Sequence, residues 1–224
     1  DIRHEAPGIG AYKLYLMLKE LYPDGMRGRD WFYGLMHESH LMLKLGKRRH
    51  TTSSNHPYRK YKNMIKGLTV NRINQLWVAD ITYIDTDEGV AYLHLLTDAF
   101  THEIIGWVLS DSLVASNTVT ALEMGISHVS PLGFDGLIHH SDRGVQYCCN
   151  QYIDRLQAIK ATISMTEDYK PTDNAIAERV NGIIKQEWLY RMKRPPDVVV
   201  ARDLLGRIIG FYNNRRPQRS NRDM

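Results

Sequence analysis

Hydrophobic side chains recur at helical spacing in the first part of the chain. Within residues 10–21 they are Leu14, Met17, Leu18 and Leu21, which share one face of an amphipathic helix. Pro23-Asp24-Gly25 predicts a turn after this helix. A second helix is expected to begin near Asp30, whose carboxylate can accept a hydrogen bond from a free backbone N–H. The pattern therefore predicts two short helices joined by a turn.

The period changes at residue 75, where β-branched and aromatic residues become frequent. Residues 75–86 hold Trp77, Val78, Ile81, Thr82, Tyr83 and Ile84, a composition typical of a strand. An Asp-Glu-Gly turn at 87–89 separates it from a second strand at 90–98, and a further turn precedes a third strand at 103–110. Three strands with short connections predict an antiparallel meander.

Helices and strands alternate beyond residue 110. The pattern predicts helices over 115–129 and 151–160 and short apolar strands over 137–140 and 162–165. Parallel strands need long crossovers, which the two helices can supply. We therefore expect an α/β fold, in which a mixed five-stranded sheet is flanked by helices and preceded by a small helix-turn-helix-like segment.

Residues 172–185 predict a later amphipathic helix with a single carboxylate, Glu178. Asp173 or Asn174 can cap its start, and its apolar face is expected to hold Ile176, Ala177, Val180, Ile183 and Ile184. The stripe that faces away from this core is expected to hold Asn174, Glu178, Asn181 and Lys185. An isolated surface glutamate is usually a solvated charge, so a function for Glu178 requires partners elsewhere. A last amphipathic helix is expected over 198–213.

The composition fits one medium domain plus a small one, because 224 residues that are 43% hydrophobic can bury a substantial core. No apolar run reaches the roughly 18 residues of a membrane span and no signal peptide opens the sequence, so no membrane partner is expected. Cys148 and Cys149 are adjacent and too few for a disulfide framework, which favours a cytoplasmic location. His37 and His40 form an HxxH pair, but no Cys-x-x-Cys completes a zinc site.

The net charge of +4 conceals basic ends and an acidic middle. Residues 1–72 hold 14 Lys and Arg against 6 Asp and Glu, residues 73–190 hold 6 against 16, and residues 191–224 hold 9 against 3. The ends would attract a polyanion through phosphate contacts, whereas the middle would repel it unless its acids bind cations. The charge pattern therefore favours a nucleic acid partner together with a metal site.

Two segments of the basic N-terminal region are candidates for contact with DNA. The first is the second expected helix, which carries Phe32, Leu35 and Met36 on one face and Arg29, Tyr33, His37 and His40 on another, as a helix in a DNA groove would. A plain helical hairpin is the alternative. The second is residues 44–66, which contain no acid and eight basic residues, namely Lys44, Lys47, Arg48, Arg49, Arg59, Lys60, Lys62 and Lys66. Tyr58 and Tyr61 lie among these charges, so this linker is predicted to bind DNA rather than to be a solvated spacer.

Three carboxylates stand where an α/β sheet usually places function. Asp80 lies within the first expected strand, Asp142 directly follows the fourth, and Glu178 lies on the late helix. A buried, unpaired aspartate is costly, and such sheets bind ligands at the carboxyl ends of their strands. Taken separately, Asp142 could form a turn with Gly144 and Asp80 could lie on the exposed face of an edge strand. Taken together, the three carboxylates indicate one shared site.

Three sequence blocks around these carboxylates resemble the motifs of DDE transposases. The blocks are Trp77-Val-Ala-Asp-Ile-Thr-Tyr83, His139-His-Ser-Asp-Arg-Gly-Val-Gln-Tyr147 and Asp173-Asn-Ala-Ile-Ala-Glu178. Residues 143–177 give the spacing between Asp142 and Glu178 that is typical of retroviral integrases and of the IS-three group of bacterial insertion-sequence transposases. Tyr212-Asn-Asn-Arg-Arg-Pro217 is similar to a C-terminal signature of the bacterial group. The departures from the common pattern touch no carboxylate and are Gln218, Val145 and the glycine-free loop 167–172.

The resemblance implies a ribonuclease-H-like fold with strand order 3-2-1-4-5, which makes the first and fourth strands neighbours. Asp80, Asp142 and Glu178 would be both the catalytic residues and the metal ligands. Oxygen ligands suit Mg²⁺, with Mn²⁺ as a substitute, and two ions roughly 3.5 to 4 Å apart are expected. His139 and His140 are expected to pack at the strand end or to contact substrate. The candidate DNA contacts are Arg29, Tyr33, His37, Lys47, Arg48, Arg49, Arg59, Lys60, Arg143, Asn174, Asn181 and Lys185.

The same resemblance implies a transposase that cuts DNA at the ends of an insertion sequence and joins the freed 3′-hydroxyl to DNA. Its expected partners are the terminal inverted repeats, target DNA, further copies of the chain in a homo-oligomer and an OrfA-type protein. The protein is expected in the cytoplasm, and on the nucleoid when it is bound to DNA. The expected domains are a DNA-binding segment at 1–45, a basic linker at 46–72 and a catalytic core with a C-terminal helix at 73–224. A hydrolytic nuclease of the same fold and a catalytically inactive or domesticated DNA-binding relative are the alternatives.

Overall fold

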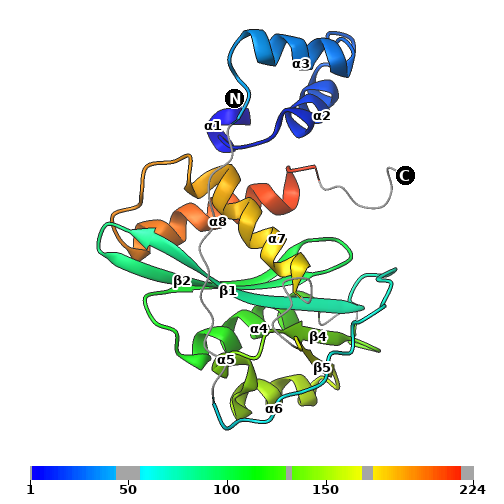
Figure 1. Cartoon of the computed structure of the whole chain (residues 1–224), viewed down its shortest axis with the longest axis vertical. Coiled ribbons are helices and arrows are strands. Elements are labelled where there is room, and N and C mark those ends of the chain that lie inside the picture. The colour runs from blue at the N-terminus through cyan, green and yellow to red at the C-terminus, as the bar shows by residue number, and fades with distance from the viewer. Residues whose placement is uncertain (1, 44–55, 130–132, 168–173, 218–224) are drawn as a thin grey trace. The chain divides into compact units, whose positions relative to one another are not determined.

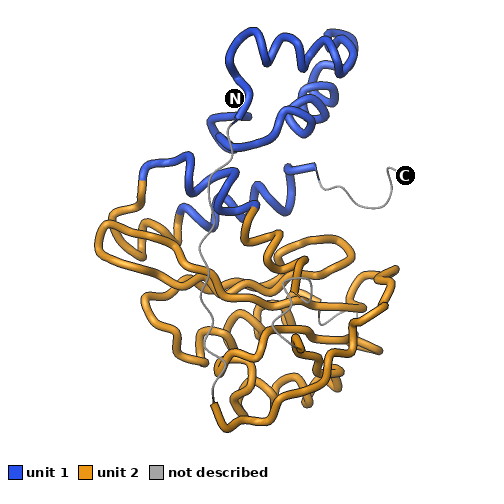
Figure 2. Tube along the Cα trace, viewed as in Figure 1, with its two compact units in different colours: residues 1–49, 183–193, 204–224 blue, residues 50–182, 194–203 orange. Residues whose placement is uncertain are grey.

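The chain forms two compact units (Figure 2). The computed structural model describes residues 2–43, 56–129, 133–167 and 174–217. The first unit combines residues 1–49, 183–193 and 204–224, and the second combines residues 50–182 and 194–203. The first unit is therefore assembled from three separate stretches of the chain.

A mixed five-stranded sheet forms the centre of the second unit (Figure 1). Its order is β3-β2-β1-β4-β5, and the strands are β1 (Leu76–Thr86), β2 (Gly89–Asp98), β3 (Ile104–Ser110), β4 (Ile138–Ser141) and β5 (Thr162–Met165). The first three pair antiparallel, whereas β4 pairs parallel with both β1 and β5. The expected mixed sheet and strand order are confirmed, and the strand ends lie within one residue of their predicted positions.

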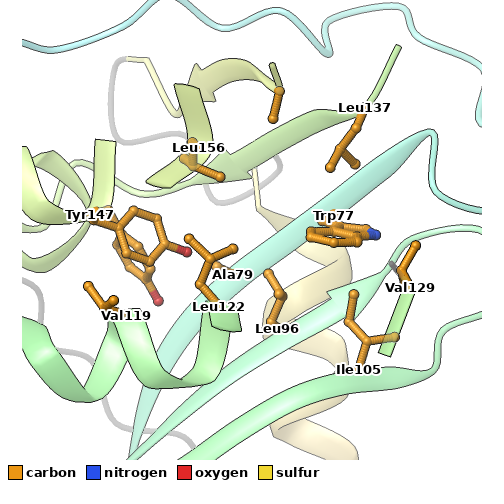
Figure 3. Close-up of a cluster of buried hydrophobic side chains, with 12 residues drawn as sticks. Trp77, Ala79, Leu96, Ile105, Val119, Leu122, Val129, Leu137, Tyr147 and Leu156 are labelled. Atoms are coloured by element: carbon orange, nitrogen blue, oxygen red, sulfur yellow. The ribbon is translucent and has the colours of Figure 1, made fainter. Parts of the chain in front are cut away.

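One face of the sheet packs against α4 (Ala115–Val129) and α6 (Asn150–Ala158). Trp77 of β1 lies in this layer with Leu122 and Leu156, and all three side chains are fully buried (Figure 3). Gly106 of β3 lets α4 approach closely, because a Cβ at this glycine would overlap the carbonyl oxygen of Ala121. The two helices are thus the crossovers that the sequence pattern predicted.

The opposite face of the sheet packs against α7 (Ala175–Ile184). Ala177 of this helix lies with Leu76 and Val78 of β1, whose side chains are almost fully buried. Side chains alternate between the two faces of a strand, so the even-numbered positions of β1 face α7 and the odd-numbered positions face α4 and α6. This alternation places Asp80 on the α7 face.

The helix boundaries around the sheet differ in detail from the predicted ones. α7 begins at Ala175, and positions 172 and 173, including the possible cap Asp173, lie outside the described residues. A short helix, α5 (Val145–Cys148), was not predicted, because four residues are too few to show a period. Val198–Asn214 forms α8, close to the expected 198–213. None of the described helices is both long and apolar enough to cross a membrane.

The first unit contains α1 (Ile2–Glu5), α2 (Ala11–Leu21), α3 (Arg29–Glu38), the π-helix η2 (Lys185–Leu189) and the last part of α8. The indole N–H of Trp188, which is fully buried, donates to the carbonyl oxygen of Glu5 at 2.7 Å. The backbone N–H of Gly8 donates to the carbonyl oxygen of Glu187. A Cβ at Gly8 would overlap the backbone of Glu187, so the first residues lie directly against η2.

The C-terminal signature also contributes to the first unit. Arg216 is 4% exposed and donates from both Nε and Nη2 to the carboxylate of Glu187, with each nitrogen–oxygen distance 2.8 Å. Tyr212 is fully buried, and its ring lies below the Arg216 guanidinium at 5.3 Å. The signature therefore anchors the C-terminal stretch to the helix that follows α7.

Two expectations for the helical hairpin are wrong. α3 begins at Arg29 with Gly28 at its cap position, so Asp30 lies inside the first turn and pairs with Arg29 at 3.0 Å instead of capping the helix. Phe32 and Met36 are buried, but Leu35 is 42% exposed. Two short helices cover only a narrow stripe of each other, and the i, i+4 pair fills it.

Candidate active site

Asp80 and Asp142 lie at the same level of the sheet because of the β1–β4 register. The last parallel pair in this ladder joins Val78 with His140, and the two aspartates each follow two residues later. β4 ends at Ser141, whereas β1 continues past Asp80 to Thr86. An aspartate in the middle of one strand thus lies beside the carboxyl end of its neighbour, where α/β sheets place ligands.

A tight turn fixes the Asp142 side chain. The backbone N–H of Gly144 donates to Asp142 Oδ1 at 2.9 Å, and a Cβ at Gly144 would lie 3.0 Å from the same oxygen. The turn between Asp142 and Gly144 that the sequence allowed is therefore present. The Asp142 side chain is half-buried, and this turn holds one of its carboxylate oxygens.

α7 and the residue before it place Glu178 and two asparagines next to β1. Glu178 is half-buried, whereas Asn174 and Asn181 are 7% and 5% exposed. Asn181 Nδ2 donates to Asp80 Oδ2 at 2.7 Å, and Asn174 Nδ2 donates to the carbonyl oxygen of Ala79 at 3.1 Å. The expectation that both asparagines face away from the core is therefore wrong. Both asparagines lie against β1, because the carbonyl oxygen of Ala79 and the carboxylate of Asp80 offer hydrogen-bond acceptors there.

The three carboxylates interact electrostatically. Burial and the neighbouring charge of Asp142 raise the pKa of Asp80 to about 7, Glu178 adds to the increase, and the hydrogen bond from Asn181 opposes it. Burial also raises the pKa of Asp142, while the Gly144 hydrogen bond opposes the increase. A pair of partly buried acids that repel each other is a common signature of a site that receives a cation or a proton.

The donor chemistry of these carboxylates fits a divalent cation. Carboxylate oxygens are the ligands that Mg²⁺ prefers, and a cation would remove the repulsion that raises the pKa of Asp80. Within the described ranges, however, no three His, Cys, Asp or Glu side chains are close enough to share one ion. Asp80 and Asp142 are the two candidate ligands that the sheet register places at the same level, and Glu178 is the third candidate, on α7.

Two further residues near the aspartates were not predicted. The phenol oxygen of Tyr147 is buried without a hydrogen-bond partner among the described residues, and burial, Asp80 and Asp142 all raise its pKa. His56 Nε2 lies 2.7 Å from the carbonyl oxygen of Arg143, beside Asp142. Tyr147 belongs to the same sequence block as Asp142, which was a usable signal, whereas no local pattern marked His56.

The two histidines of β4 are structural. His139 and His140 are fully buried. His139 Nε2 lies 2.8 Å from the Tyr152 hydroxyl, and His140 Nδ1 lies 2.8 Å from Ser164 Oγ. The expected packing at the strand end is confirmed, and both imidazoles are held within the protein.

The second half of the basic linker is docked along β5. The backbone N–H of Met165 in β5 donates to the carbonyl oxygen of Lys62 at 3.3 Å, and Met64 N–H donates to Ser164 Oγ at 2.8 Å. Arg59 and Lys60 remain exposed beside this attachment. Burial is the main cause of the raised pKa of Cys148; the charge of Asp142 adds to the increase, and Lys60 and Arg143 oppose it. Lys60 and Arg143 therefore lie near the same cysteine as Asp142.

The other candidate DNA contacts are spread over both units and beyond the described residues. Arg29 and His37 are exposed on α3, and Tyr33 is half-buried there. Lys185 is the first residue of η2 and belongs to the first unit. Arg143 is half-buried in the loop after β4. Lys47, Arg48 and Arg49 lie outside the described residues.

Comparisons with known proteins agree with this geometry. Two models described as integrase core domain match residues 70–171 and 159–224. The transposase of insertion sequence element IS629 from Shigella sonnei is 33% identical over 76% of the chain and 56% of that protein. A 31 kDa protein of insertion element IS600 from Shigella sonnei is 36% identical over 84% of the chain and 70% of that protein. The transposase InsF of insertion sequence IS3A from Escherichia coli is 35% identical over 52% of the chain and 40% of that protein.

Among solved structures, the chain is similar to the HTLV-2 integrase catalytic core domain in complex with magnesium. The TM-score is 0.51 at 18% identity, over 66% of this chain and 92% of that one, which shows a common fold. The chain spans about half the length of the first curated relatives it matches.

Proposed function

The chain belongs to the integrase-core transposases of bacterial insertion sequences, the group that includes the IS3A transposase, and we propose that it cuts and joins DNA at the ends of such an element. The observation that carries the proposal is the side-by-side placement of Asp80 and Asp142 with Glu178 on the helix above them. Its proposed partners are the terminal inverted repeats and target DNA, with several copies of the chain in the assembly. Two of the named relatives are transposases, and one solved neighbour is titled as an intasome.

We assign the metal site to Asp80, Asp142 and Glu178. Bound Mg²⁺, or Mn²⁺ in its place, would supply Lewis-acid activation of the attacking oxygen and stabilise the leaving oxygen of the phosphodiester. The charged carboxylates would attract the cation and hold it by oxygen ligation, and Glu178 would contribute from α7. The fold neighbour whose title names magnesium supports this assignment.

The remaining residues of the site would orient DNA around the carboxylates. Arg59, Lys60 and Arg143 offer positive charge near Asp142, where a phosphodiester would otherwise meet an acidic surface. Water and a DNA 3′-hydroxyl are equivalent nucleophiles at such a site, so cutting and joining need no separate catalytic groups. A transposase and a hydrolytic nuclease therefore differ in which nucleophile they hold.

The first prediction concerns the three carboxylates. Asp80→Asn, Asp142→Asn and Glu178→Gln are each expected to lower Mg²⁺-dependent cleavage of element-end DNA by at least about 1000-fold, because each removes a charged oxygen ligand. DNA binding, measured by electrophoretic mobility shift, is expected to persist in all three. Cleavage and strand transfer should be followed on the same labelled substrate, since products of hydrolysis alone would favour the nuclease.

Matched controls for this prediction lie on the same hairpin. Asp85→Asn and Glu88→Gln remove exposed carboxylates near the end of β1 and in the turn that follows it. Both controls are expected to cut element ends at the rate of the unchanged protein. Full cleavage by the Asp80 or Asp142 variant would show that the proposed site is not the catalytic one.

A further inference from the structure

Asn181 makes a direct contact with one carboxylate of the proposed site. Its Nδ2 donates to Asp80 Oδ2 at 2.7 Å, and the side chain is 5% exposed. Glu178 lies three residues earlier on α7, a spacing that puts both side chains on neighbouring parts of one helix face. One face of α7 therefore carries both the acid Glu178 and the amide Asn181 next to β1.

The side-chain hydrogen-bond donor to Asp80 is an uncharged amide, that of Asn181. An arginine or lysine at this position would neutralise Asp80, whereas an amide donor is uncharged and preserves the negative charge that a cation needs. The hydrogen bond favours the ionised carboxylate and so opposes the effect of burial. It also holds Asp80 Oδ2 in place beside the backbone hydrogen bond from Ile81, which restricts the rotamer of the Asp80 side chain.

Packing of α7 alone does not account for this asparagine. Burying an amide costs free energy unless its polar atoms are paired, and Asn181 Oδ1 accepts no hydrogen bond from any residue that the structure describes. An apolar side chain of similar volume would hold the helix to the sheet without that cost, as Ala177 and Val180 do. The amide is therefore retained for what its N–H group contacts.

Asn174 provides the contrast within the same helix region. It is buried to a similar degree, but its amide donates to the backbone carbonyl oxygen of Ala79 and not to a carboxylate. Loss of either asparagine removes one hydrogen bond between the α7 region and β1. Only the loss of Asn181 removes a hydrogen bond from the side chain of Asp80.

We propose that Asn181 is a positioning residue that holds the Asp80 carboxylate in its metal-binding orientation. The inference rests on the proposed metal-dependent function and assigns Asn181 a role inside the protein instead of the contact with DNA expected from the sequence. Groups that orient a metal ligand in this way typically contribute a factor of about 10 to 100 to metal affinity or activity.

The test measures metal binding directly, without DNA. Mn²⁺ is titrated into the full chain, and free Mn²⁺ is followed by its electron paramagnetic resonance signal. Asn181→Ala and Asn181→Leu, the second of which preserves side-chain volume, are expected to weaken Mn²⁺ binding about 10-fold or more. Asn174→Ala is the matched control and is expected to bind Mn²⁺ within about twofold of the unchanged protein. Urea unfolding of all four proteins reports the structural cost of each change.

Each result decides the matter in one direction. Weaker binding in both Asn181 variants, with similar losses of unfolding free energy in Asn181→Ala and Asn174→Ala, supports the positioning role. Equal Mn²⁺ affinity in the Asn181 variants and the unchanged protein overturns it, as does an equal loss in Asn174→Ala, which would indicate a structural role. Absence of Mn²⁺ binding and of Mn²⁺-dependent cleavage in the unchanged protein would instead refute the proposed function, and the inference with it.

Discussion

Asp80 destabilises the metal-free fold at neutral pH. Its pKa is about 7 in the folded protein, above the ordinary value of 3.8, so the folded state disfavours the charged form. The cost is absent below about pH 4, grows as the pH rises to about 7 and is constant above that. Proteins commonly sacrifice stability at functional sites in this way.

The residue-scale prediction follows from this sign. Asp80→Asn is expected to raise the free energy of unfolding of metal-free protein by about 1 to 3 kcal/mol at pH 8, and to leave it unchanged at pH 4. Urea unfolding in the presence of a chelator measures both values. Asp85→Asn, an exposed change on the same strand, should leave the unfolding curve unchanged at both pH values. A loss of stability in Asp80→Asn would contradict the electrostatic account.

At this scale the sequence identified the acids better than their neighbours. Asp80 and Asp142 were recognisable because each stands in an unusual place, one within an apolar strand and the other directly after one. The orientation of Asn174 and Asn181 was not recognisable, because helical periodicity separates an apolar stripe from a polar one but does not say whether the polar stripe meets water or another element. His56 was missed for a related reason, since its contact with Arg143 spans 87 positions.

A helix can pack closely against a strand only where the side chains between them are small. Gly106 in β3 and Gly182 in α7 provide a test, because a Cβ would clash at the first and not at the second. Gly106→Ala is expected to destabilise the protein by about 2 kcal/mol or more, because its Cβ would overlap the backbone of α4. Gly182→Ala is the matched opposite, since nothing lies within 4 Å of its Cβ position in α7. It is expected to stabilise the helix by about 0.5 to 1 kcal/mol. Thermal unfolding of the two variants should shift in opposite directions, and a shift in the same direction would contradict the packing model.

The strands were predicted more accurately than the helix ends. Alternation and β-branched content marked β1, β2 and β3 because each is half-buried and bounded by turns. The start of α3 lies within one residue of the predicted Asp30, but the predicted cap was wrong, since Asp30 lies inside the first turn of the helix. The residue type makes Asp30 a suitable helix cap, but the path of the preceding turn places Gly28 at the cap position.

Two buried neutral histidines contribute to the loss of stability in acid. Burial lowers the pKa of His94 to about 4 and of His139 to about 3, from an ordinary value of 6.5. The unfolded chain therefore binds protons that the folded chain does not, and stability that is complete above about pH 6.5 is lost as the pH falls. Asp80 opposes this trend, because it takes up a proton in the folded state over the same range.

The whole-molecule prediction separates these opposing effects. In the Asp80→Asn background, each buried histidine is expected to contribute a fall of about 2 kcal/mol in the free energy of unfolding between pH 7 and pH 5. Replacing His94 by Asn in that background should make the pH dependence shallower, because one titrating group is removed. Urea unfolding at pH 5, 6 and 7 measures the slope. An equal slope with and without His94 would show that its burial does not control acid stability.

The charge pattern predicted a nucleic acid partner, but it did not predict how the first unit is built. Basic ends and an acidic middle were countable from the sequence, but no local pattern joins residue 8 to residue 187 or Arg216 to Glu187. Such long-range contacts depend on the complete fold. The sequence therefore could not predict that three separate stretches of the chain form the first unit.

That discontinuous construction has a consequence for synthesis on the ribosome. Glu5 and Gly8 are synthesised long before their partners on η2, and Glu187 in turn pairs with Arg216. Domains made of one continuous stretch can fold while translation continues. This unit must wait until Arg216 has been added to the chain, so a translation product that stops before η2 would carry α1, α2 and α3 without the residues that pack against them.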